Sequence, residues 1–159
     1  MGIDSGIYKL VLVLHILTAI IGFGGMFIAG FYGAEARNRP GREGLAVAET
    51  TLKVTDRIPT VAVYLVPILG ILLILLSDDT WKFSEAWISL SLLLYIVLVA
   101  LAVTVQVPAI RKMVAVRQGA DGAQPLQMQA EEKKVATVGG IVNLLWIVVL
   151  FLMVFKPGH

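Results

Sequence analysis

One histidine lies inside the first long apolar stretch of the chain, and it is the residue there best able to do chemistry. His15 belongs to the run LVLHILTAIIGFGGMFIAGF, residues 12–31, which contains no Asp, Glu, Lys or Arg. An ionisable side chain at membrane depth is costly, so it usually faces other helices and suggests a functional site. A neutral imidazole can also simply hydrogen-bond to a neighbouring helix, whereas a functional one binds a metal or carries a proton. The sequence leaves both interpretations of His15 open.

Other polar side chains of the apolar stretches fall at similar depths. At about 1.5 Å per helical residue, Tyr95 and Trp146 are predicted at the level of His15, in the outer half of a membrane. Thr18, Tyr64 and Asn143 are predicted about one turn deeper. We therefore expect one inward-facing ligand site with His15, Tyr95 and Asn143 at its centre. The candidate ligand-binding residues are His15, Thr18, Tyr64, Tyr95, Asn143 and Trp146.

Several kinds of chemistry are excluded by what the sequence lacks. The chain has no cysteine, which rules out disulfides, thiol nucleophiles and Cys-ligated zinc or iron–sulfur clusters. A Ser/His/Asp hydrolase needs an acid beside its histidine, and none lies near His15, so we do not expect an enzyme. The second histidine is the terminal His159, which makes a site with several membrane imidazoles implausible within one chain.

Haem and quinone remain possible ligands. His15 is a metal ligand only if haem or another metal is bound. For haem it would supply one axial ligand, and a Met, a Tyr or the His15 of a second protomer would supply the other. A pocket for a quinone or a lipid beside His15 and Tyr95 would need no second axial ligand, unlike a haem site.

The elements that position these residues are predicted to be membrane helices. The chain has 159 residues, of which 58% are hydrophobic, and its mean hydropathy is +0.86, which favours a polytopic membrane protein. Four apolar runs, at about 7–32, 58–76, 86–107 and 135–155, are each long enough to cross a bilayer. We therefore predict an all-α fold in which residues 1–159 form one antiparallel four-transmembrane-helix bundle.

Charge predicts how the bundle is oriented. Basic residues gather in two of the connections. They are Arg37, Arg39, Arg42, Lys53 and Arg57 in the first, and Arg111, Lys112, Arg117, Lys133 and Lys134 in the second. The positive-inside rule places both basic loops in the cytoplasm and both termini outside, with the protein in the cell's inner (plasma) membrane. Since topology accounts for these charges, no nucleic-acid partner is expected.

The first basic connection is too long for a turn. Leu45, Ala48, Leu52 and Thr55 recur at helical spacing, which predicts a short amphipathic helix on the cytoplasmic surface.

Small residues predict where helices approach closely. Those at helical spacing in the first run share one face, and a glycine pair lies in the last run. The predicted packing residues are Gly22, Gly25, Ala29, Gly33, Gly139 and Gly140. We expect these faces to support a homodimer or other homo-oligomer within the lipid bilayer.

Short motifs resemble a known family. The segment LHILTAIIGFGG, the Trp87-Ile88-Ser89 start of the third run and its VPAIRKM ending resemble an uncharacterised bacterial family of integral membrane proteins, domain of unknown function 2269. That resemblance implies a fold without a known activity. Leu14-His15 with its downstream glycines is also similar to the first helix of copper-resistance D-type domains and of haem-binding membrane protoporphyrinogen oxidases. This second likeness implies metal or haem chemistry at His15.

Three functional hypotheses follow from these patterns. The first is a binding or accessory membrane protein with an intramembrane polar site around His15. The second is a haem- or quinone-linked redox membrane protein. The third is a small oligomeric transporter or channel, which requires a continuous polar path beyond His15.

Overall fold

The described part of the chain is helical. The computed structural model describes residues 2–39, 41–56, 58–119 and 126–158, and every regular element among them is a helix. The helices are α1 (Gly6–Asn38), α2 (Gly41–Asp56), α3 (Ile58–Leu76), α4 (Ala86–Leu101), the π-helix η1 (Ala102–Gln106), α5 (Val107–Gly119) and α6 (Leu126–Phe155). The predicted all-α class is confirmed for these residues.

Three helical segments are long and apolar enough to cross a membrane. They are Gly6–Asn38, Ala86–Val116 and Glu131–Phe155, and a shorter apolar helix covers Thr60–Leu76. Large apolar side chains point away from the protein on all four, such as Leu10 at 61% exposure, Leu75 at 68% and Leu144 at 62%. An apolar outer surface of this kind fits a helix bundle embedded in lipid. The fourth crossing, by α3, stays a prediction.

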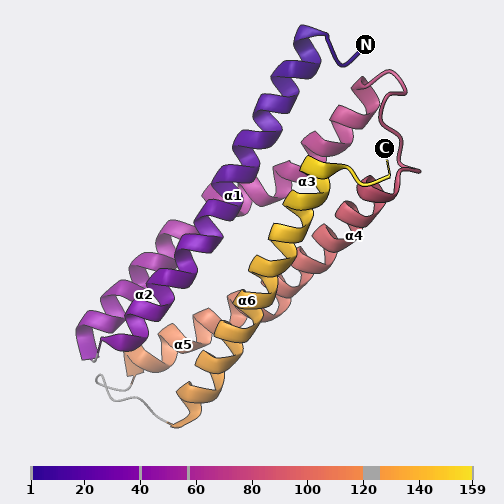
Figure 1. The fold of residues 1–159 in the computed structure, drawn as a ribbon. Coiled ribbons are helices and arrows are strands. Elements are labelled where there is room, and N and C mark those ends of the chain that lie inside the picture. The colour runs from indigo at the N-terminus through magenta and orange to yellow at the C-terminus, as the bar shows by residue number, and fades with distance from the viewer. Residues whose placement is uncertain (1, 40, 57, 120–125, 159) are drawn as a thin grey trace.

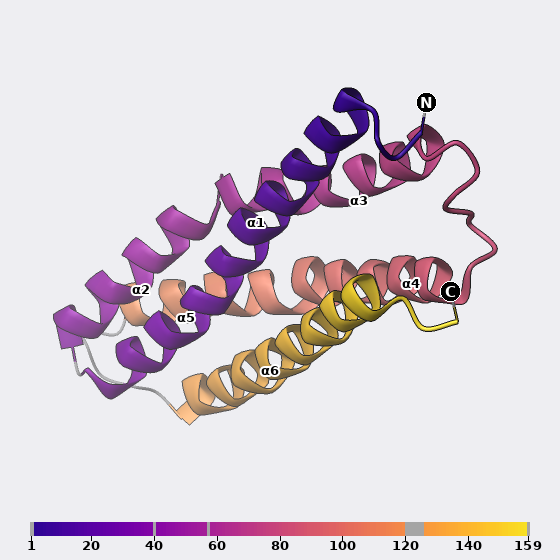
Figure 2. The ribbon, with the colours of Figure 1, turned by 45° about the horizontal axis from the view of Figure 1, so that its top comes forward.

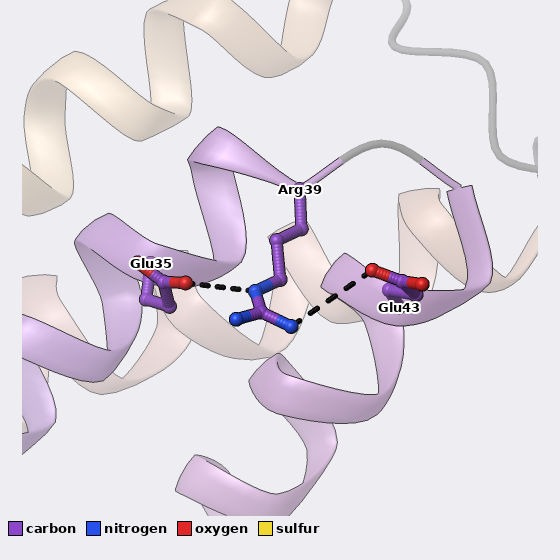
Figure 3. A network of polar contacts seen from close by, with 3 residues as sticks. All are labelled: Glu35, Arg39 and Glu43. Atoms are coloured by element: carbon purple, nitrogen blue, oxygen red, sulfur yellow. Dashed lines mark hydrogen bonds and ion pairs between the residues drawn. The ribbon is translucent and has the colours of Figure 1, made fainter.

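The turn between α1 and α2 is tied by one arginine (Figure 3). Arg39 donates from Nε to Glu35 Oε1 at 2.7 Å, and its Nη1 lies 3.8 Å from Glu43 Oε2. The hydrogen bond to Glu35 raises the pKa of the Arg39 guanidinium. α1 ends at Asn38 because Arg39 is extended, with φ −106° and ψ 123°, the conformation that a following proline favours. α2 then begins at Gly41, so the connection between the two helices is short.

The third apolar run continues as one long helix through Pro108. Proline has no N–H and clashes with the preceding turn of an α-helix. The backbone widens just before it, where η1 spans Ala102–Gln106 and the Val107 N–H bonds the Ala102 carbonyl. π-Bulges often absorb such a mismatch. α4, η1 and α5 therefore follow one another without a break, and the helix continues beyond residue 107, where the predicted third run ends.

The helices form two layers that diverge toward the end where both termini lie (Figures 1 and 2). α1 packs on α3 in one layer and α4 packs on α6 in the other, while α1 and α6 touch between the layers. α2 packs along α1 and also contacts α5. The amphipathic helix is therefore present, but it lies alongside the bundle (Figure 2) instead of flat across its end.

Polar contacts link the helices at the end away from the termini. Lys112 of α5 donates to Glu131 of α6 at 2.7 Å. Gln118 of α5 donates to Glu49 of α2 at 2.8 Å. The α5–α6 hairpin and the α2 helix are thereby joined at the end that carries the basic residues.

Candidate functional site

A cavity of about 600 Å³ lies between the two helix layers on the side of the termini. All four apolar helices contribute to its walls, which are almost entirely hydrocarbon and aromatic. α1 contributes His15 and Ile20, α3 contributes Gly70, α4 contributes Ser91 and α6 contributes Met153. The cavity exists because the layers diverge there, so side chains that would meet in a closed bundle instead line a space.

Aromatic rings close the inner end of this cavity. Phe23 of α1 stacks on Trp146 of α6, with ring centroids 3.3 Å apart, and meets the Tyr95 ring edge-on at 5.9 Å. Phe23 and Tyr95 are buried with Leu98 and Val142 in the main hydrophobic cluster. This aromatic layer is where the two helix layers join and where the cavity ends.

A proline in α3 frees one backbone carbonyl, which a neighbouring helix satisfies. Pro67 has no N–H to donate to the Val63 carbonyl four residues earlier. The Tyr95 hydroxyl donates to that Val63 carbonyl instead. Prolines are tolerated in membrane helices when neighbouring helices satisfy the freed groups, and α4 does so here. One turn nearer the termini, His15 Nδ1 of α1 lies 3.0 Å from the Val66 carbonyl, which the proline does not free.

The hydrogen bond of His15 fixes the chemistry of its ring. Because a carbonyl can only accept, Nδ1 must carry the proton that reaches Val66. In the neutral ring Nε2 is then an acceptor with a free lone pair. Gly70 makes room for the imidazole, since a Cβ on that glycine would stand 3.2 Å from His15 Cε1. His15 is thus held by α3 while its ring lines the cavity.

Tryptophans and a lysine cover the outer end of the cavity. Trp81 Nε1 donates to the Tyr8 hydroxyl at 3.0 Å, and its ring meets that of Trp87 edge-on at 5.5 Å. Lys156 Nζ lies 3.9 Å from the centroid of the Trp81 ring. Ser77, fully buried, accepts from the Trp81 N–H at 3.0 Å and so holds this loop in place. These residues connect α1, the loop after α3, α4 and the end of α6.

One fully buried polar atom of the cavity wall has no hydrogen-bond partner among the described residues. Ser91 on α4 is 1% exposed, and its Oγ makes no hydrogen bond to any described residue. Serine and threonine in helices usually bond a carbonyl in the preceding turn, as Thr18 and Thr104 do. Ser91 lines the cavity without doing so. A buried hydroxyl left unpaired costs free energy and calls for an explanation.

Comparison with known proteins identifies the family. Residues 9–157 match DUF2269, described as a predicted integral membrane protein. The chain belongs to this family. No curated protein and no solved structure matches it. Membership of DUF2269 agrees with the resemblance noted from the short motifs, and it supports an integral membrane protein without assigning a ligand or activity.

In this DUF2269 chain the predicted polar site is only partly assembled. His15, Tyr95 and Trp146 all line the cavity, whereas Thr18, Tyr64 and Asn143 do not. Thr18 donates to the carbonyls of Leu14 and His15 in its own helix, each at 2.9 Å. Tyr64 is 51% exposed on the outside of α3. Asn143 is half-buried on α6, and His15 and Tyr95 each reach a backbone carbonyl of α3 and not Asn143.

The predicted depths also differ from the structure. Trp146 stacks on Phe23, which follows His15 by two helical turns and so lies about 12 Å deeper. Counting inward from the helix ends misplaced Trp146 because α1 extends beyond the end of α6 (Figure 1). Tyr95 is likewise about one turn deeper than His15, since it bonds Val63 and not Val66.

The predicted packing glycines have different surroundings. A Cβ on Gly22 would lie 3.1 Å from Val63 Cγ2 and 3.2 Å from the Val63 backbone nitrogen, so α1 and α3 approach closely there. A Cβ on Gly139 would meet Gln106 Nε2 at 3.3 Å. Gly33 and Gly140 have nothing within 4 Å of that position. Gly25 is half-buried, and the side chain of Ala29 lies outside the described part of the structure.

Among the lining residues that the sequence did not suggest, three matter most for the cavity. Ser91, Gly70 and Lys156 line it, yet none was a candidate. Gly70 had a sequence signal, because it follows Pro67 by one turn in the same helix. Ser91 and Lys156 offered no such signal, since their importance depends on how far the two layers diverge.

Proposed function

We propose that this protein is a non-enzymatic membrane protein that binds a lipid-soluble molecule between its two helix layers. The observation that carries the proposal is the cavity of about 600 Å³, which is within the usual size range of small-molecule sites. Its apolar walls suit a hydrocarbon ligand. Residues of the α1 and α6 walls are also open to the surroundings, with Ile20 63% and Val154 66% exposed. Entry from the bilayer through the gap between α1 and α6 fits this arrangement.

A bulky side chain in the cavity should abolish binding. Gly24 lines the cavity, and a Cβ there has nothing within 4 Å, so Gly24→Phe should fill the space without disturbing the helix packing. We expect an apolar diazirine hydrocarbon, photolysed with the purified protein in nanodiscs, to label peptides of the cavity wall. Gly24→Phe should reduce this labelling at least about tenfold, which is a loss of about 1.4 kcal/mol of binding free energy.

Gly30→Phe is the matched control for that experiment. Gly30 is an exposed glycine of the same helix, away from the cavity, with nothing within 4 Å of its Cβ position. Its substitution should leave cavity labelling unchanged. Labelling that is spread evenly over lipid-facing peptides, or that survives Gly24→Phe, would contradict the proposed binding function.

Haem is a second candidate, favoured by one observation. Met153 of α6 lines the same cavity as His15 of α1, and His–Met ligation is a known haem arrangement. The bond from Nδ1 to Val66 orients the His15 ring, as carbonyls that accept from metal-ligating histidines do, and Nε2 would hold the iron if haem were bound. Bound haem would supply one-electron redox chemistry.

A visible spectrum separates haem from the first proposal. If haem is the ligand, protein purified after expression with ample haem should show a Soret band that shifts on reduction and is lost in His15→Ala. Met153→Leu, which keeps the size of the side chain, should shift that band without removing it. A colourless wild-type protein would eliminate this candidate.

A transporter or channel has less support than binding. In the described part of one chain, the cavity ends at the aromatic layer of Phe23, Tyr95 and Trp146. Thr104, one of the few polar residues beyond that layer, is exposed and bonds its own helix. A transport path would therefore need more than one copy of the chain.

We also propose a membrane orientation and a homodimeric assembly for the protein. Lys53 lies in the last turn of α2. Arg39 directly follows α1, and Lys112 and Lys133 lie on α5 and α6, so these three belong to the end of the bundle opposite the termini (Figure 1). Their shared position supports basic loops in the cytoplasm and termini outside the inner membrane. Gly33 and Gly140, which meet no other part of the described chain, are positions where a second copy could approach in a homodimer.

A further inference from the structure

Two polar atoms of the cavity wall lack partners within the described chain. Ser91 Oγ is buried and unbonded on the α4 side. His15 Nε2 is unbonded on the α1 side, because the one hydrogen bond of that ring is made by Nδ1. Both residues line the same apolar cavity. An unpaired polar group in such surroundings costs free energy that a ligand carrying the complementary group would recover.

The two atoms call for different complementary groups. Nδ1–H donates to the Val66 carbonyl, so Nε2 of the neutral ring can only accept, and its partner must be a donor. The Ser91 hydroxyl can donate or accept. A ligand that offers only carbonyl oxygens would satisfy Ser91 and leave His15 unpaired. A ligand with a hydroxyl group can satisfy both residues.

Charge restricts the ligand further. Among the residues that line the cavity, the one that carries a formal charge is Lys156, at the outer end. Its ammonium lies over the Trp81 ring at 3.9 Å, away from the aromatic layer at the inner end. An ionised headgroup deep in the cavity would have no counter-charge there, which is costly in an apolar medium. The ligand should therefore be neutral.

We propose that the cavity binds a neutral lipid bearing a hydroxyl group, with that O–H donating to His15 Nε2 and with Ser91 bonding a ligand oxygen. Its hydrocarbon chain would lie along the apolar walls of α1 and α6. The inference rests on the proposed binding function and adds the chemistry that the cavity selects. Lipid alcohols and quinols share this chemistry, and the test below distinguishes them.

The test is competition against the diazirine hydrocarbon that labels the cavity of the intact protein in nanodiscs. Hexadecanol should block cavity labelling at a concentration at least about tenfold lower than hexadecyl methyl ether, which has the chain but no O–H. A short-chain benzoquinol should likewise outcompete its own quinone. The stronger competitor of the two hydroxyl compounds then names the source of the ligand.

Ser91→Ala should raise the concentrations of hexadecanol and of the ether needed for competition by about the same factor, because both offer an oxygen to the Ser91 hydroxyl, and should keep the advantage of hexadecanol, which comes from the O–H donated to His15. The variant removes an unpaired buried hydroxyl, so it should be at least as stable as the wild type, and weaker competition cannot come from misfolding. Ser89→Ala is the control, because Ser89 is exposed on the same helix, bonds the Phe83 carbonyl and should leave competition by both compounds unchanged. Equal competition by alcohol and ether in the wild type would overturn this inference while cavity labelling upholds the proposed function. Absence of cavity labelling would overturn both.

Discussion

Gly22→Leu should destabilise the protein by about 2 kcal/mol, measured by SDS-induced unfolding in mixed detergent micelles. A Cβ at position 22 would stand 3.1 Å from Val63 Cγ2 and 3.2 Å from the Val63 backbone nitrogen, so α1 and α3 must separate. Forcing extra side-chain volume into a packed contact typically costs about 1–3 kcal/mol. Leucine recovers part of that cost because it is a better helix former than glycine.

Gly30, on the same helix, provides the comparison. Gly30→Leu places the same side chain on the same helix where nothing lies within 4 Å of the Cβ position. Its effect should stay below about 1 kcal/mol and favour the folded state. If Gly22→Leu and Gly30→Leu changed stability equally, the close approach of α1 to α3 at Gly22 would not be a stabilising contact.

Tyr95→Phe should cost about 1–2 kcal/mol of unfolding free energy in the same assay. The Tyr95 hydroxyl donates to the Val63 carbonyl, which Pro67 cannot bond because it has no N–H. Removing the hydroxyl leaves a buried carbonyl without a donor, and such a group costs about 1–3 kcal/mol. This cost exceeds that of an average side-chain hydrogen bond between membrane helices, about 0.6 kcal/mol, because the carbonyl has no alternative partner.

A second variant, Pro67→Ala, tests whether Tyr95 is needed because it satisfies the Val63 carbonyl. An alanine at position 67 has an N–H that can bond the Val63 carbonyl within α3, so the hydroxyl of Tyr95 becomes dispensable. In that background Tyr95→Phe should cost less than about 0.5 kcal/mol, which gives a coupling energy near 1 kcal/mol for the pair. A cost that is the same in both backgrounds would mean that Tyr95 stabilises the protein through packing alone.

The helices themselves were largely predictable from the sequence, because composition and length determine them. Long apolar runs in a chain of high hydropathy have few structures open to them other than helices, and the runs predicted at 58–76 and 135–155 end where α3 and α6 end. α2 starts at Gly41, before Leu45 where the predicted amphipathic pattern begins, because the glycines and the proline there carry no helical pattern. The π-helix before Pro108 had no signal beyond the proline itself.

The site was predictable only in part, for a geometric reason. A polar residue in an apolar run indicates that a partner exists, which selected His15 and Tyr95. The partners are backbone carbonyls of α3 at Val63 and Val66, and a search for clustered polar side chains does not find them. Asn143 and Tyr64 were grouped with His15 by depth alone. Depth specifies only the position of a residue along the membrane normal. Helix tilt, helix rotation and the divergence of the layers determine which side chains at that depth meet.

The division of the helices into two layers has a consequence for how the protein is made. The first layer consists of α1, α2 and α3, the second of α4, α5 and α6, and the loop at 77–85 connects them. Each layer is a continuous stretch of chain, so most helix contacts are available before the other layer has been synthesised, and chains assemble in such units as they emerge. We expect the first three helices to pair while the ribosome is still translating the rest. The cavity, which needs both layers, is then the last feature to form, and it closes in a bilayer where lipid molecules are already present.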